Sequence, residues 1–170
     1  MKKISMTAVI AALALTVSAA MPLTSMASET VADQNTEITV EAEESTENYA
    51  NELFALVNEE RAKAGLVPYI LDDAVVAAAD TRVLELEDIF SHKRSGEKHF
   101  STILNESGIS FTAASETIAA GQTTPAAALS AWFESSRHRG HILSTKYTRI
   151  GIAHDRNENG TDYWVMLFLN

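Results

Sequence analysis

The sequence predicts an α+β domain, a three-layer α–β–α sandwich in which a small antiparallel sheet lies between helices. Two segments, 48–64 and another that starts near residue 72, repeat apolar residues with the period of an α-helix. The run YWVMLFL at 163–169 is apolar throughout, so we expect a central strand covered on both faces. Asn159-Gly160, just before it, is a hairpin signal that makes the last two strands antiparallel neighbours. Such a sheet must bury both faces against helices.

The first two helices have clear boundaries in the sequence. The first is expected over 48–64, because Gly65 suits a C-terminal cap and Pro68 prevents continuation. The second begins at the cap signal Asp72-Asp73. Its expected buried stripe consists of Val76, Ala79, Val83, Leu86 and Phe90. Phe90 is expected to fix the end of this helix in the core.

The remaining elements follow from turn and capping residues. Residues 90–100 are expected to form a polar loop, followed by a short helix within 100–104. Thr124-Pro125 provides a threonine cap with proline at the first helical position, and this last helix should run to about Ser135. The strands are expected at 110–120, 149–154 and 163–169.

The first 48 residues differ in composition from the rest. Residues 1–27 have a charged start, an apolar stretch and an A-x-A-like site, which predicts a secretory signal peptide cut after Ala27, with Ala20 as another site. An uncleaved membrane anchor is the alternative. Residues 28–48 contain seven acidic residues, no basic residue and no aromatic residue, which predicts an acidic disordered tether. The globular domain is expected at 49–170.

Charge and cysteine content narrow the functional classes. The net charge of the whole chain is −10, and without residues 1–48 it is −5, so no basic patch favours nucleic acid. The chain has no cysteine, which excludes thiol catalysis, cysteine-ligated zinc and disulfides. Together with the signal, these features predict a secreted, extracellular or cell-surface protein with no stable membrane insertion after cleavage.

The segment AWFESSRHRGHIL, 131–143, concentrates the chemistry-bearing side chains. If it is a single helix, Glu134, His138 and His141 have the spacing i, i+4 and i+7 and share one face. A carboxylate and two imidazoles on one face suit a metal or acid–base site, and they equally suit a hydrated surface. Trp132 is expected to be a core anchor beneath this segment.

Six motifs in this order resemble the CAP domain family (SCP/PR-1-like) in its bacterial secreted form. They are LVNEERAKAGL, LDDAVVAAA, FSH, SETIA, AWFESSRHRGHIL and IGIA followed by the terminal YWV strand. The resemblance covers residues 49–170. It implies an α–β–α sandwich with a cleft lined by two histidines and two glutamates, which holds a divalent metal such as zinc in some members.

The resemblance assigns site residues by position. The FSH histidine is His92, the glutamate of the family's Gly-Glu-Asn motif is Glu116, and the histidine of the S-x-G-H-R-x-N-I-L pattern is His138. The family's second glutamate corresponds to Ser135, with Glu134 one residue earlier, so whether Glu134 replaces it stays open. The expected cleft is therefore His92, Glu116, Glu134 and His138, with His92 and His138 as metal ligands. No catalytic residue is assigned.

This chain departs from the family pattern next to these residues. Serine and threonine flank Glu116 where glycine and asparagine are expected, Arg137 replaces a glycine, and His141 replaces an asparagine. We expect His141 to satisfy backbone groups at the turn, and His99 and His154 to lie at the surface. Each candidate also has a structural reading: His92 as the cap of a helix C-terminus, and Glu116 on a solvent-facing strand.

Two functions follow as hypotheses. The first is an extracellular binding module for a lipid, a glycan or a protein ligand, whose His/Glu cleft holds a divalent metal. The alternative is a metal-assisted hydrolase, similar to a peptidase, in which Glu116 acts as the base. A purely structural domain is the third reading. Neither H-E-x-x-H nor G-x-S-x-G occurs in the sequence.

Overall fold

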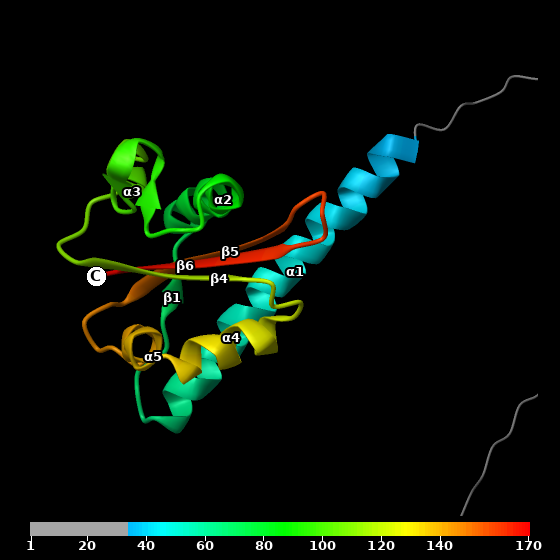
Figure 1. Ribbon diagram of the computed structural model, residues 1–170. Coiled ribbons are helices and arrows are strands. Elements are labelled where there is room, and N and C mark those ends of the chain that lie inside the picture. Colours follow the sequence, from blue (N-terminus) through cyan, green and yellow to red (C-terminus); the bar gives the residue numbers. More distant parts are fainter. Residues whose placement is uncertain (1–33) are drawn as a thin grey trace, which may run out of the picture. The chain divides into compact units, whose positions relative to one another are not determined.

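A four-stranded sheet forms the middle layer of the computed structural model, which describes residues 34–170 (Figure 1). The expected signal peptide and residues 28–33 lie outside the described part. The strand order is β1-β5-β6-β4, with bounds Ile70–Leu71 for β1, Arg149–Arg156 for β5, Asp162–Leu169 for β6 and Ala114–Ala120 for β4. As expected, β6 is central and pairs antiparallel with both β4 and β5.

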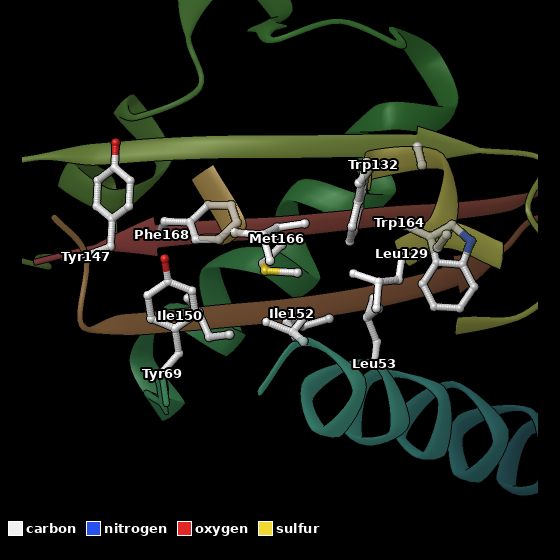
Figure 2. Close-up of a cluster of buried hydrophobic side chains, with 14 residues drawn as sticks. Leu53, Tyr69, Leu129, Trp132, Tyr147, Ile150, Ile152, Trp164, Met166 and Phe168 are labelled. Atoms are coloured by element: carbon white, nitrogen blue, oxygen red, sulfur yellow. The ribbon is translucent and has the colours of Figure 1, made fainter. Parts of the chain in front are cut away.

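The sheet is mixed rather than purely antiparallel, because β1 pairs parallel with β5. The sequence did not predict β1, since two residues are too few to show a period. Successive side chains of a strand point to opposite faces of the sheet, and both faces of β6 are buried, as its central place requires. Trp164, Met166 and Phe168 pack on one face, in the core cluster shown in Figure 2, and the residues between them pack on the other face.

Helices cover both faces of the sheet, which confirms the three-layer sandwich (Figure 1). One face carries α1 (Gln34–Lys63), α4 (Pro125–Glu134) and α5 (Ser136–Ile142). The other carries α2 (Asp73–Asp88) and α3 (Thr102–Glu106). The expected polar loop 90–100 contains a small hairpin of β2 (Lys93–Arg94) and β3 (Lys98–His99), joined by the 3-10 turn η1 (Ser95–Glu97).

The expected capping residues start their helices. The Asp72 carboxylate accepts hydrogen bonds from the backbone N–H groups of Ala74 and Val75, which begins α2. Thr124 accepts from the N–H of Ala127, with proline at the first position of α4. These contacts satisfy backbone donors that a helix N-terminus otherwise leaves unpaired.

The long first helix corrects the expected tether. α1 begins at Gln34, so residues 34–48 are helical and the helix does not start at residue 48. Propagating a helix from an existing one is far easier than nucleating it, and the segment from Tyr49 onward packs on the sheet and supplies that nucleus. Low hydrophobicity argued against a packed core in 28–48, but it does not prevent a helix that is already nucleated from propagating.

The buried face of α2 differs slightly from the expected stripe. Val75, rather than Val76, is fully buried, and Phe90 is 54% exposed and does not fix the helix end in the core. α2 ends at Asp88, so Phe90 no longer follows the helical period. Val75 lies directly over β5: a Cβ atom added to Gly151 would sit 2.2 Å from the Val75 carbonyl oxygen. Gly151 therefore permits the close contact between α2 and the sheet.

Candidate functional site

Glu116 lies on β4 in the interior of the domain. Its side chain has no exposed surface, and its Oε2 atom accepts a hydrogen bond of 2.9 Å from Nε of Arg82 on α2. Arg82 is also fully buried. A buried carboxylate requires such a partner, because an unpaired charge away from water is costly. The alternative reading, in which Glu116 lies on a solvent-facing strand, is therefore wrong, whereas its need for a partner is confirmed.

Arg82 was not predicted from the sequence. It falls among the small apolar residues of α2, between Ala79 and Leu86, at a helical spacing that places it on the buried face. This position on the buried face of a helix is the sequence feature from which the burial of Arg82 could have been inferred. Its guanidinium also donates a hydrogen bond to the backbone oxygen of Ser91 and contacts Glu85, 3.4 Å away. Arg82 thus holds the residue next to His92 in place.

His92 contacts Glu116 directly. Its Nδ1 atom lies 3.0 Å from Glu116 Oε1, and 47% of its side chain is exposed. A carboxylate only accepts hydrogen bonds, so Nδ1 carries the hydrogen. In the neutral ring Nε2 is then left with a free lone pair. His92 does not cap α2, whose C-terminal cap residue is Ile89.

His138 comes from the opposite layer of the sandwich and approaches His92. The two ring centroids are 6.4 Å apart in an edge-to-face arrangement. Burial lowers the pKa of His138, and the nearby His92 and Arg137 lower it further. His138 is therefore neutral at pH 7. The structure thus brings together His92, Glu116 and His138, which we call the His/Glu site.

Glu134 does not share a helical face with the histidines. α4 ends at Glu134, and Ser135 has an extended backbone and caps α5, so the segment 131–143 is two helices with a corner between them. Glu134 is exposed and makes no hydrogen bond within the described residues. Only part of the expected cleft is therefore assembled.

α5 is held at its C-terminal end by two residues from outside it. Arg61 Nη1 donates to the backbone oxygens of Ile142, at 2.7 Å, and Ser144, at 2.8 Å. The guanidinium lies 3.5 Å over the ring of Tyr69, whose hydroxyl donates to the backbone oxygen of His141 at 2.8 Å. A cation at a helix C-terminus is favourable. These contacts set the position of His138.

The other three histidines are not counted in the His/Glu site, although His141 is close to it: burial lowers the pKa of His141, and the nearby His138 and His92 lower it further. The ring of His141 is half-buried against Tyr147 and Phe168 and makes no hydrogen bond within the described residues, so it does not serve the turn as expected. His99 is exposed, as expected. His154 is only 8% exposed, which corrects its expected surface position. Its alternation with Ile150 and Ile152 on β5 was the signal that placed it inside.

The donor set suits a metal only in part. Zinc in proteins has four ligands in structural sites and three protein ligands in catalytic sites. Among residues 48–170 no group of three or more His, Asp and Glu side chains is arranged to hold a metal. His92 and His138 can supply two imidazoles, with Glu116 orienting His92 as a hydrogen-bonded carboxylate commonly orients a metal-bound histidine. The Glu116 carboxylate already forms an ion pair with Arg82, which makes it a poor third metal ligand.

The sequence matches a known family model, described as the CAP, or cysteine-rich secretory protein, family, over residues 54–168. The Bacillus subtilis protein YkwD is 31% identical over 138 residues, which are 80% of this chain and 52% of that protein. The chain therefore spans about half the length of that relative.

Solved structures share the fold. An extracellular protein with an SCP domain from Bacillus anthracis superposes with a TM-score of 0.68 at 23% identity, over 74% of this chain and 41% of that one. An outer surface protein from Borrelia burgdorferi gives 0.65 at 21% identity, over 71% and 90%. Within residues 34–170, none of the helices has the length and apolar character that a bilayer span requires.

Proposed function

Because the chain belongs to the CAP family, we propose that it is an extracellular or cell-surface binding module whose ligand contacts the His/Glu site. The two structural relatives described as extracellular or outer-surface proteins support this location. The expected signal peptide agrees with it. The ligand classes consistent with the site are a lipid, a glycan or a protein, with a divalent metal such as zinc at His92 and His138.

The hydrogen bond between His92 Nδ1 and Glu116 Oε1 is the observation that carries this proposal. It fixes the tautomer of His92 and leaves Nε2 as an acceptor or metal donor on a partly exposed ring. The pKa of His138, which burial lowers, favours the neutral form of that ring. His92 Nε2 and the ring of His138 are therefore the groups that the site offers to a ligand.

Binding fits this arrangement better than hydrolysis. In a metal-assisted hydrolase Glu116 would accept a proton from a bound water. Its carboxylate is instead engaged by both Arg82 and His92, and its side chain has no exposed surface. We therefore place a binding role before a catalytic one.

Calorimetric titration of zinc into the full-length chain tests the metal part of the proposal. We expect measurable binding that weakens at least about tenfold in His92→Ala and in His138→Ala, since each variant removes one of two ligands. His99→Ala is the matched control, because His99 is an exposed histidine outside the site. Equal binding by all four proteins would refute a His92–His138 metal site. Zinc-dependent cleavage in a peptide and ester screen would favour the hydrolase instead.

A further inference from the structure

The loop between α1 and β1 carries the two most exposed large apolar side chains of the described residues. Val67 is 79% exposed and Ile70 is 65% exposed, and Pro68 between them is exposed as well. We call these three residues the apolar tip. Single apolar residues on a surface are common, whereas apolar residues that gather at one place mark sites of interaction. The apolar tip is therefore a candidate contact surface.

Side chains of α1 hold the apolar tip in its exposed arrangement. Arg61 Nε donates to the backbone oxygen of Val67 at 2.9 Å. The side chain of Asn58 binds both backbone groups of Tyr69: its Oδ1 accepts from N at 2.8 Å, and its Nδ2 donates to O at 3.2 Å. Tyr69 is buried and anchors the loop just before Ile70. The exposure of the tip is thus built into the folded domain.

α5 and the segment that follows it lie beside the loop that carries the apolar tip (Figure 1). The guanidinium of Arg61 that binds Val67 also donates to the backbone oxygens of Ile142 and Ser144. On the other side of Tyr69, the backbone N–H of Ile70 donates to the backbone oxygen of residue 148 at 3.0 Å. The segment 142–148 therefore borders the tip.

α5 and this segment carry three cations without a partner. Arg137, Arg139 and Lys146 are exposed, and within the part of the chain whose side chains are described they form no ion pair and no side-chain hydrogen bond. Every other lysine and arginine there pairs with a carboxylate, except Arg61, which binds backbone oxygens. Residues 135–154 also contain no acidic residue. The unpaired positive charge of the domain is thus concentrated next to the apolar tip.

The acidic residues nearest to the tip in the sequence are Glu59 and Glu60, on the last turns of α1. Glu60 forms an ion pair of 2.6 Å with Lys63, so the three unpaired cations outweigh what remains. Charges at a surface act over about 8 Å at physiological salt. A positive surface of this kind therefore attracts an anionic partner locally, although the domain as a whole carries a charge of −5.

We propose that the apolar tip and the cations beside it dock the domain on a bilayer that contains anionic lipids. Lysine and arginine are attracted to anionic head groups, and exposed apolar side chains enter the boundary between head groups and acyl chains. A bilayer accepts a small tip without shape complementarity, whereas a stable protein interface needs about 800 Å² from each partner. This contact requires no ligand at the His/Glu site and goes beyond the function proposed above.

A single fluorescent probe on the tip tests the proposal, because the chain has no cysteine of its own. Val67→Cys in the full-length chain is labelled with nitrobenzoxadiazole, whose emission rises and shifts to the blue when it leaves water. Leu84→Cys, labelled in the same way, is the matched control, because Leu84 is 56% exposed on α2 in the opposite helix layer. With vesicles of equal parts phosphatidylglycerol and phosphatidylcholine, we expect a saturable blue shift from the first label and little response from the second. Both proteins share residues 1–27, so membrane contact by the expected signal peptide does not produce this difference.

Charge variants in the labelled Val67→Cys chain test the role of the cations. Arg139→Gln/Lys146→Gln should weaken partitioning into these vesicles at least about tenfold. Lys93→Gln/Lys98→Gln removes the same charge from the hairpin of β2 and β3 in the opposite layer, and should weaken it less than about threefold. All four side chains are exposed, and urea midpoints check that both variants fold.

Four results would overturn the proposal. Three are equal responses of the two labels, equal losses in the two double variants, and equal partitioning into vesicles of pure phosphatidylcholine. The fourth is a blue shift of the label on the tip that grows with protein concentration in the absence of vesicles, because the tip would then dock on a second copy of the chain.

Discussion

Arg82 Nε lies 2.9 Å from Glu116 Oε2, and neither side chain is exposed to solvent. This ion pair joins α2 to β4 across the interface between a helix layer and the sheet. Because Glu116 also contacts His92, the pair supports the one histidine of the site that lies on an irregular segment. Stability and the geometry of the His/Glu site are therefore coupled at Arg82.

We predict that Arg82→Met lowers the free energy of unfolding by about 3–5 kcal/mol, because it leaves the Glu116 charge buried without its partner. Urea unfolding followed by circular dichroism measures this change. The double variant Arg82→Met/Glu116→Gln should recover a large part of the loss, since it removes the charge as well. Lys63→Met, which breaks an exposed pair with Glu60, should leave the stability close to that of the wild type. An Arg82→Met protein as stable as the Lys63→Met control would contradict this account.

Gly151→Ala should be strongly destabilising. The added methyl group would lie 2.2 Å from the Val75 carbonyl oxygen, so α2 and β5 must separate, at a cost of about 1–3 kcal/mol or more. Gly140→Ala is the control, because nothing lies within 4 Å of its added Cβ. It sits within α5 and should gain up to about 1 kcal/mol from helix propensity. Thermal unfolding of both variants measures the contrast, and similar melting temperatures would refute it.

Stability should fall as the pH drops below about 6.5, in part through His154. Burial lowers the pKa of His154 from its ordinary value of 6.5, although Asp162 opposes the shift. The unfolded chain therefore takes up a proton at a higher pH than the folded chain does, which favours unfolding as acid is added. The lowered pKa values of His138 and His141 act in the same direction.

Urea midpoints measured from pH 8 to pH 5 check this dependence. His154→Gln should show a shallower decline than the wild type, whatever its stability at pH 8, because one titrating group has been removed. Parallel curves for the two proteins would show that His154 does not contribute.

A proline scan tests the N-terminal extension of α1. Glu43→Pro should reduce the helical signal at 222 nm while leaving the unfolding midpoint close to that of the wild type, because the described packing of this helix on the sheet begins at Tyr49. Glu52→Pro interrupts the packed part and should lower the midpoint by an amount corresponding to about 3 kcal/mol. If Glu43→Pro leaves the signal at 222 nm unchanged, residues 34–48 are not helical in solution.

Elements with local chemical signals were predictable from the sequence. Asp72 and Thr124 cap their helices where expected, and the apolar run 163–169 forms the central strand. β1 was missed because its two residues are placed by β5 and the turn into α2 rather than by a pattern of their own. The start of α1 was missed because helix propagation depends on the packed segment that follows it.

The site was only partly predictable. Family resemblance identified His92, Glu116 and His138, which the fold brings together from three separate segments. Spacing alone grouped Glu134 with the histidines, and the corner at Ser135 breaks that grouping. Arg82 escaped notice because a long cationic side chain is expected in solvent, and only its partner on a distant strand explains its burial.

The short helix α5 shows that the histidine-containing segment 131–143 depends on the rest of the domain for its structure. With only seven residues it is too short to persist alone in water, and its position depends on Ser135 at one end and on Arg61 and Tyr69 at the other. A synthetic peptide of this sequence, or its graft onto another scaffold, would contain every histidine of the segment but would not reproduce their arrangement.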